Sequence, residues 1–191
     1  MSVSGIFNSH LIMAAAVERH GTEAQKESYL PRFATGELRG GVALTEPDAG
    51  TDLQAIRTVA KREGNEGYRV NGNKMWITNS IHGNCVALLA KTDPNAKPRH
   101  TGMSLFIAEK GPGFNVSRRL EKLGYKGIDT AELVFEDYFV AADRLIGGEE
   151  GFGLKQVLSG LELGRINVAA RGVGIAQATL DESVKYSQMR K

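Results

Sequence analysis

The spacing of hydrophobic positions changes twice along this 191-residue chain. From about residue 8 to residue 35 apolar side chains recur at helical spacing, and Gly21 is placed to end a first helix. Thr22, followed three positions later by Gln25, matches a capping box that begins a second helix. Pro31 is expected to limit this helix or to begin a last short turn, and Gly36 closes the zone. The pattern therefore predicts a pair of helices at the start of the chain.

From about residue 37 to residue 145 the pattern alternates with a period of two, which is typical of half-buried β-strands. Turn residues separate the short apolar runs, and Asn71-Gly72-Asn73 suits a tight hairpin. Strand-rich runs at such short spacing favour an antiparallel barrel or sandwich. The runs are GGVALT, AIRTVAKR, GYRVNG, KMWITNS, CVALLAK, MSLFIAEK, FNVSRRL and TAELVFEDYFV.

From about residue 151 the helical spacing returns, and the sequence stops within this run without a C-cap signal, which predicts that it is a fragment. The predicted fold class is α+β, with an antiparallel β-barrel or sandwich inserted between helical segments. We expect residues 1–36 to end an N-terminal helical domain, residues 37–147 to form a middle β-domain, and residues 148–191 to begin a C-terminal helical domain.

Composition narrows the class of partner. The formal net charge is only +2 and no long Lys/Arg block is present, which argues against a nucleic-acid partner. No apolar run approaches the roughly 20 residues of a membrane span. A single cysteine, Cys85, excludes an internal disulfide and fits a reducing compartment, and the four histidines lack metal-ligand spacing. We therefore expect no nucleic acid, membrane span or metal.

Two segments carry candidate chemistry. The first, Ala43 to Asp52, is a short strand that runs through Pro47 into a small-residue turn, where backbone N–H groups can approach a flat or anionic ligand. The second, Lys74 to Asn79, is a strand in which alternation places Trp76 and Thr78 on one face. An aromatic plane beside a hydroxyl suits a heterocycle with polar edges, although an isolated barrel tryptophan is more often packed in the core.

These two segments, together with Lys122 to Thr130 and Leu161 to Gln177, resemble the acyl-CoA dehydrogenase family in sequence and spacing. The resemblance implies an FAD cofactor, an acyl-CoA substrate, and α,β-dehydrogenation of its thioester. It also implies an electron-transfer flavoprotein as electron acceptor and a homo-oligomer, a dimer or a tetramer, in the β-oxidation of fatty acids. The implied location is the bacterial cytoplasm or, in a eukaryote, the mitochondrial matrix.

The resemblance also implies roles for particular residues. Leu44 and Thr45 match donors to the flavin edge where negative charge develops, Trp76 matches a neighbour of the ring, and Thr78 lies near flavin N5. Thr51, Glu162 and Arg165 match substrate-side positions, and Thr51 also matches a contact to the flavin phosphate. The implied cofactor-binding positions together are Val42, Leu44, Thr45, Gly50, Thr51, Trp76, Ile77, Thr78 and Arg190, the last of which matches an arginine that reaches the FAD diphosphate of a neighbouring subunit.

No catalytic base is expected within this sequence. Many members of the family place a glutamate far downstream, beyond residue 191, and a minority place it directly before the arginine matched by Arg165, where this chain has Gly164. We therefore expect no dehydrogenase turnover from these 191 residues alone. Two alternatives stay open: a non-catalytic scaffold that binds flavin or acyl-CoA, and a flavin monooxygenase or oxidase of the same fold.

Overall fold

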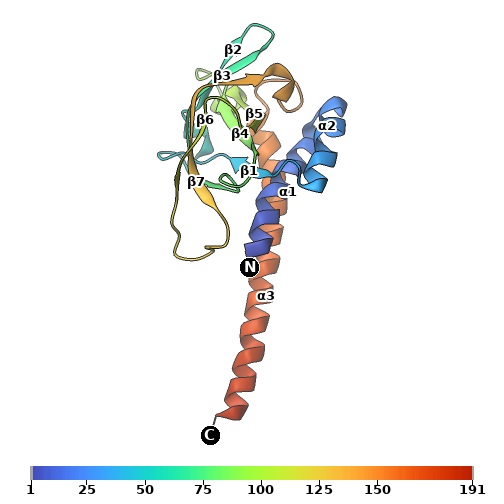
Figure 1. Cartoon of the computed structure of the whole chain (residues 1–191), viewed down its shortest axis with the longest axis vertical. Coiled ribbons are helices and arrows are strands. Elements are labelled where there is room, and N and C mark those ends of the chain that lie inside the picture. Colours follow the sequence, from blue (N-terminus) through green and yellow to red (C-terminus); the bar gives the residue numbers. More distant parts are fainter. Residues whose placement is uncertain (1, 191) are drawn as a thin grey trace.

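A computed structural model describes residues 2–190 and shows two short helices, a curled β-sheet and one long helix (Figure 1). Helix α1 spans Ser2–His20, α2 spans Glu23–Thr35, and α3 spans Gly153–Met189. The predicted capping box is confirmed, because the Thr22 side chain accepts from Gln25 N and the Gln25 side chain accepts from Thr22 N. Gly36 ends α2 in the left-handed conformation, with a φ of 77°.

Of the two expectations for Pro31, the second is confirmed: Pro31 does not end α2 but lies inside it, and the helix continues for a last short turn to Thr35. A proline removes one helical hydrogen bond and crowds the carbonyl four residues earlier. The helix tolerates this because Tyr29 and Phe33, on either side of Pro31, are both buried in the core. Packing of these two rings outweighs the lost backbone bond.

The sheet contains seven strands in the order β1-β4-β2-β3-β7-β6, with β5 paired to β4. The predicted α+β class is confirmed, but the sheet is not wholly antiparallel: β1 and β2 both run parallel to β4. Consecutive hairpins force antiparallel pairing, whereas β1 reaches β4 only through a long excursion of the chain. The strands are β1 Gly40–Ala43, β2 Val59–Glu63, β3 Gly67–Thr78, β4 Cys85–Lys91, β5 Met103–Glu109, β6 Phe114–Arg119 and β7 Thr130–Ala141, and short 3-10 turns cover Leu53–Ala55, Arg99–Gly102 and Ala142–Arg144.

Strand β3 joins two of the predicted runs, so the hairpin predicted at Asn71-Gly72-Asn73 was wrong. The turn between β2 and β3 lies earlier, at residues 64–66, where Gly64 has a φ of 54°. Gly72 instead marks a register shift in the pairing with β7. A Cβ atom on Gly72 would lie 2.4 Å from Thr58 Oγ1, so this glycine lets the segment that contains Thr58 approach β3 closely.

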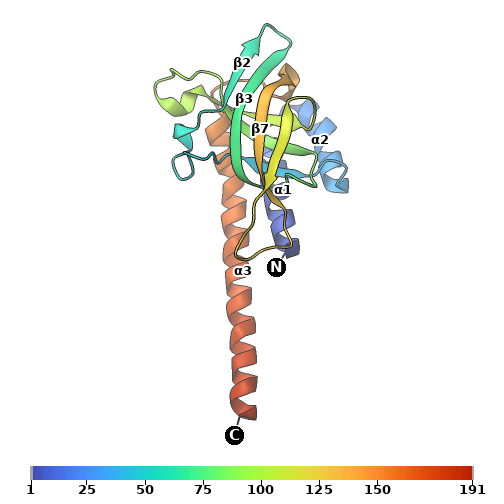
Figure 2. The same ribbon diagram turned by 60° about the vertical axis from the view of Figure 1, so that its left-hand side comes forward.

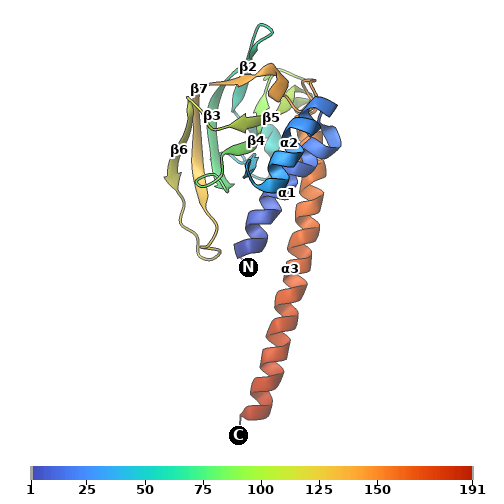
Figure 3. The same cartoon turned by 45° about the vertical axis from the view of Figure 1, so that its right-hand side comes forward.

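Two apolar cores flank strands β4 and β5. Alternate residues of β4, Ala87 and Leu89, face the helices, while Leu88 and Ala90 face the interior of the curled sheet. Both faces of β4 are therefore buried, and Figures 2 and 3 show the helices covering one face while β3, β7 and β6 curl over the other. The sheet and the two short helices together hold the start of α3 in place.

Helix α3 extends well past the rest of the molecule (Figures 1 and 2). Its first turns are packed, and Val157 is completely buried. Its later part leaves large apolar side chains in solvent, among them Ile166, Val173 and Leu180. Within residues 2–190 no helix, α3 included, has the length and hydropathy needed to cross a membrane.

Candidate functional site

The two sequence motifs meet where the chain leaves β1 and runs beside β3. Met75 N donates to Thr45 O at 2.8 Å, which ties the first motif to the second. Gly41 brings β1 close to the end of β3, because a Cβ atom there would lie 2.7 Å from Thr78 O. The structure therefore brings together Val42, Leu44 and Thr45 with Trp76, Ile77 and Thr78, as the sequence predicted for one site.

Trp76 lies on the surface and has an unusual backbone conformation. Its φ is 64°, in the left-handed region that bulky residues rarely adopt, and 53% of its surface is exposed. Strain of this kind amounts to roughly 1–3 kcal/mol and tends to occur at functional sites. The alternative that Trp76 is a packed core aromatic is therefore wrong for this chain.

Simple alternation fails through this part of β3. Lys74 and Ile77, three positions apart, are both buried, because a register shift against β7 lies between them. Alternation would have put Lys74 on the side of Trp76. The exposure of Trp76 thus follows from the irregular backbone and not from simple alternation along the strand. Thr78, one residue past buried Ile77, is half-buried.

Several polar groups at this site are available to a ligand. Among residues 2–190 no hydrogen bond is made by the Thr45 N–H, nor by the hydroxyls of Thr45, Thr51 and Thr78. Gly50 faces open space, since an added Cβ would have no neighbour within 4 Å. An exposed aromatic plane beside uncommitted donors fits the isoalloxazine ring of FAD, which is flat and carries polar atoms on its edges.

A buried ion pair lies directly behind the site. Lys74 Nζ donates to Leu44 O at 3.0 Å and to Glu46 Oε1 at 2.9 Å, and the Lys74 side chain has no exposed surface. The Glu46 carboxylate also accepts from Arg57 N at 2.5 Å and from Thr58 N at 3.0 Å. Every oxygen of this carboxylate therefore has a donor, as a buried charge requires.

Both members of the ion pair have pKa values below their ordinary ones, for different reasons. Burial lowers the pKa of Lys74 to about 8, against the opposing attraction of Glu46, which favours the charged amine. Burial acts to raise the pKa of Glu46, but the charge of Lys74 and the hydrogen bonds from Lys74, Thr58 and Arg57 outweigh it. The pKa of Glu46 therefore lies below its ordinary value, and both groups are charged at neutral pH.

The predicted substrate-side residues lie on α3. Glu162 and Arg165 are exposed, and neither forms an ion pair within the described part of the chain. Gly164, the position at which a minority of relatives carry the base, is buried against α1, and a Cβ there would lie 2.7 Å from Ile12 Cδ1. The structure thus leaves Glu162 and Arg165 free to meet a ligand and places Gly164 in a helix contact.

Arg190 is not brought to the other cofactor positions. It is the C-cap residue of α3, at the end farthest from the sheet, and it is exposed (Figure 1). With a rise of about 1.5 Å per residue, the 26 residues from Gly164 to Arg190 separate it by about 39 Å from the packed part of the helix. A role at the FAD diphosphate of a neighbouring subunit is compatible with this position, whereas a role within the same subunit is not.

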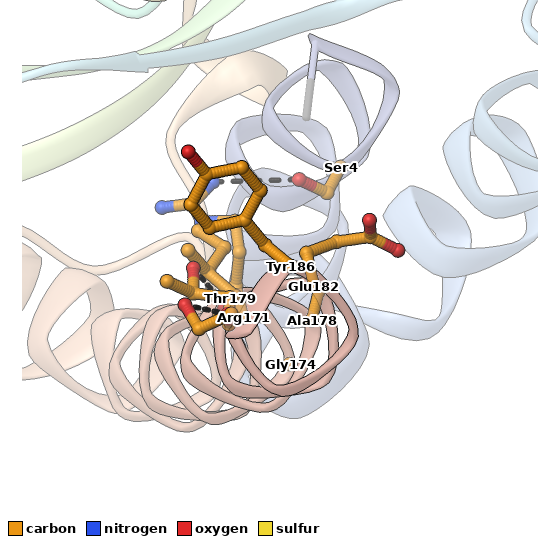
Figure 4. Close-up of a pocket in the computed structure, with 9 residues that line it drawn as sticks. Ser4, Arg171, Gly174, Ala178, Thr179, Glu182 and Tyr186 are labelled. Atoms are coloured by element: carbon orange, nitrogen blue, oxygen red, sulfur yellow. Dashed lines mark hydrogen bonds between the residues drawn. The ribbon is translucent and has the colours of Figure 1, made fainter. Parts of the chain in front are cut away.

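A large open groove lies elsewhere, between the start of α1 and the later turns of α3 (Figure 4). It has a volume of about 850 Å³, and its lining includes Ser4, Arg171 and Tyr186. Arg171 donates to Ser4 Oγ at 3.4 Å and bonds the Tyr125 hydroxyl. None of the sequence-predicted site residues lines this groove.

The sequence did not reveal the residues that support the site. Glu46 and Lys74 belong to the two motifs, and their pairing is visible only once the strands are placed. Asn79 was likewise missed: it has a φ of 60°, and its Nδ2 donates to Ile6 O and Gly40 O, which ties α1 and β1 to the end of β3. The available signal was the presence of opposite charges in the two motifs, Glu46 in the first and Lys74 in the second.

Comparison with known proteins identifies the family of this chain. Residues 41–138 match the acyl-CoA dehydrogenase middle domain, and residues 1–37 match the acyl-CoA dehydrogenase N-terminal domain. The chain belongs to the acyl-CoA dehydrogenase family, as its motifs had indicated.

Particular relatives are similar over nearly the whole chain. A mitochondrial isovaleryl-CoA dehydrogenase from Pongo abelii is 44% identical over 174 residues, which is 91% of this chain and 41% of the relative. The structure of butyryl-CoA dehydrogenase from Megasphaera elsdenii gives a TM-score of 0.91 at 37% identity, covering 98% of this chain and 50% of that one. The prolyl acyl carrier protein oxidase AnaB gives 0.92 at 31% identity, covering 100% and 50%. This chain therefore spans about half the length of these relatives.

Proposed function

We propose that this chain carries the flavin-binding part of an FAD-dependent acyl-CoA dehydrogenase, an oxidoreductase that forms the α,β double bond of an acyl-CoA thioester. The observation that carries the proposal is the convergence of the two motifs, where Met75 N binds Thr45 O and places an exposed Trp76 beside uncommitted threonine donors. Family membership supports the same cofactor and reaction.

Bound FAD would supply the hydride acceptor of this reaction. Leu44 and Thr45 would hold the pyrimidine edge of the flavin through backbone N–H groups and the Thr45 hydroxyl, and Val42 would contribute backbone contact. Trp76 would cover the ring and exclude water, while Ile77, buried in the sheet, anchors the segment that presents Thr78. Gly50 and Thr51 would lie along the phosphates or the CoA moiety, and Glu162 and Arg165 would face the substrate.

No residue of this chain is assigned as the base that removes the α-proton. The position that bears it in a minority of the family is Gly164, whose backbone packs on α1.

We further propose that the domains divide at residues 1–36, 37–147 and 148–191. We also propose a dimer or tetramer in which Arg190 reaches the FAD of a neighbouring subunit, and an electron-transfer flavoprotein as electron acceptor. The bacterial cytoplasm or the mitochondrial matrix is the proposed location, and β-oxidation the proposed process.

Trp76 makes a direct test possible, because it is the only tryptophan in the sequence. Titration of the purified chain with FAD should quench both tryptophan and flavin fluorescence. Thr45→Val and Thr78→Val should each weaken FAD binding about 5- to 10-fold, the value of one lost hydrogen bond at a desolvated site. Thr35→Val, at the exposed end of α2, is the matched control and should leave binding unchanged. Absence of quenching in the unaltered chain would contradict the proposal.

An oxidase of the same fold is the second candidate, favoured by the similarity to the prolyl acyl carrier protein oxidase AnaB. The two candidates differ in what reoxidises the reduced flavin. Photoreduced FAD bound to the chain should pass electrons to an electron-transfer flavoprotein faster than to oxygen if the protein is a dehydrogenase. Rapid peroxide formation in air would favour the oxidase. Flavin binding without reduction by any acyl-CoA in the complete protein would favour a non-catalytic scaffold.

A further inference from the structure

Lys74 stands out among the charged residues because it is completely buried and yet faces the flavin-side motif from behind. A lysine in an antiparallel strand ordinarily extends into solvent, and a buried one must be paired. Its ammonium donates to the Glu46 carboxylate and to the carbonyl oxygen of Leu44. The contact with Leu44 gives a second N–H of the buried ammonium an acceptor, and it joins the charge to the backbone beside the site.

Leu44 O and the Thr45 N–H belong to one peptide group, which lies between Lys74 and the proposed flavin edge. The ammonium of Lys74 is 3.0 Å from the carbonyl oxygen, and the N–H at the other end of the group has no partner within residues 2–190. A cation that binds a peptide carbonyl draws electron density toward the oxygen and makes the N–H of that peptide a stronger donor. The peptide is also fixed from the next residue, because Thr45 O accepts from Met75 N.

We infer that Lys74 is a positioning residue: its ammonium fixes and polarises the Leu44–Thr45 peptide so that the Thr45 N–H donates more strongly to the flavin edge. This inference rests on the proposed function. Glu46 keeps the ammonium in place, and the two backbone donors of Arg57 and Thr58 keep Glu46 in place. Charge accumulates at this flavin edge on reduction, so the strengthened donor would matter most in the reduced state.

The alternative is that the ion pair only holds the loop after β1 to β3. The two roles predict different results for two variants. In Glu46→Gln the Lys74 ammonium still donates to Leu44 O, so the peptide stays polarised. The amide nitrogen of the new glutamine faces the N–H of Arg57, where two donors meet, so the fold is less stable. Lys74→Met combined with Glu46→Gln removes the unpaired buried charge and with it the polarisation, so the fold is better tolerated while the donor is weakened.

The experiment measures FAD affinity through Trp76 fluorescence, unfolding free energy in urea, and the carbonyl stretching bands of bound FAD in infrared difference spectra. Measurements are made at pH 5.5, well below the pKa of about 8 that Lys74 has in the unaltered chain, because loss of the Glu46 charge lowers the pKa of Lys74 further. Lys61→Met, at an exposed lysine of the neighbouring strand β2, is the matched control for the loss of a lysine. All four proteins are the same chain, differing only at these positions.

Glu46→Gln should be less stable than the unaltered chain but bind FAD within about 2-fold of it, because the donor persists. The double variant should be at least as stable as Glu46→Gln, yet bind FAD about 5-fold more weakly and show a flavin carbonyl band at higher wavenumber. Lys61→Met should change neither quantity. Affinity that follows stability across the variants, or an unchanged carbonyl band in the double variant, would overturn the inference while leaving the proposed function intact.

If the unaltered chain binds no FAD, the proposed function fails and the inference fails with it, so the first titration separates the two claims. If Glu46→Gln does not fold, the double variant is compared with Lys61→Met at equal temperature. The carbonyl band then decides, because a purely structural role for Lys74 gives the same band in every protein that still binds FAD.

Discussion

Two glycines of α3 should respond in opposite directions to the same substitution. Gly160 lies against α1, where an added Cβ would be 2.7 Å from the backbone oxygen Ile12 O and 3.1 Å from Ile12 Cγ2. Gly172 lies farther along the same helix, and a Cβ there would have nothing within 4 Å. Both are interior helix positions, so alanine has the same intrinsic advantage at each. Only the contact with α1 differs.

The expected changes in unfolding free energy combine two contributions, the helix propensity of alanine and the steric cost of the new Cβ atom. Replacing glycine by alanine within a helix contributes roughly 1 kcal/mol of stability. At Gly160 the new Cβ would be about 0.7 Å short of the 3.4 Å at which contacts become ordinary, and a backbone oxygen cannot rotate away. Overpacking of this kind costs about 1–3 kcal/mol, so Gly160→Ala should be net destabilising by about 1 kcal/mol. Gly172→Ala should instead stabilise its part of α3 by up to about 1 kcal/mol.

Urea unfolding followed by circular dichroism measures the global effect of Gly160→Ala, and thermal loss of helical signal measures the local effect of Gly172→Ala. Gly164→Ala is an informative third variant, because its Cβ would meet Ile12 Cδ1, the tip of a side chain that can rotate. It should fall between the other two. Equal stabilisation by Gly160→Ala and Gly172→Ala would refute the claim that α1 and α3 pack through this glycine.

Three further outcomes are expected. Between its folded pKa of about 8 and the ordinary 10.5, Lys74 holds fewer protons in the folded chain than in the unfolded one. The unfolding free energy should therefore rise with pH across this window by on the order of 1 kcal/mol per unit, relative to the Lys74→Met/Glu46→Gln variant, and urea titrations at pH 8 and 10 measure it. Thr22→Ala should lower the unfolding free energy by about 1 kcal/mol, since it removes the capping box of α2, and an unchanged urea midpoint would contradict this. The exposed apolar side chains of α3 should make the chain self-associate with increasing concentration on size exclusion, and Val173→Glu/Leu180→Glu should reduce this, whereas a clean monomer at all concentrations would not fit.

Local signals predicted most of the fold. The capping box at Thr22, the stop at Gly36 and the strand runs all lie within short windows, and the structure places helices and strands close to the predicted ranges. The failures share one cause. The conformation at Asn71-Gly72-Asn73 and the parallel pairing of β1 with β4 were each decided by partners distant in sequence, which a local pattern does not contain.

The residues of the candidate site likewise fall into those that the sequence could predict and those that only the structure shows. Thr45, Trp76 and Thr78 could be named from motif and resemblance, but the conformation that exposes Trp76 depends on a register shift against β7, more than 50 residues away. The pairing of Lys74 with Glu46 links positions 28 residues apart, and only the placed strands show it. A charged residue at the centre of a strand motif is costly to bury unless a partner is built for it. Both members of this pair lie inside the two segments that meet at the candidate site, and this placement is the reason for inferring that Lys74 acts on the Leu44–Thr45 peptide.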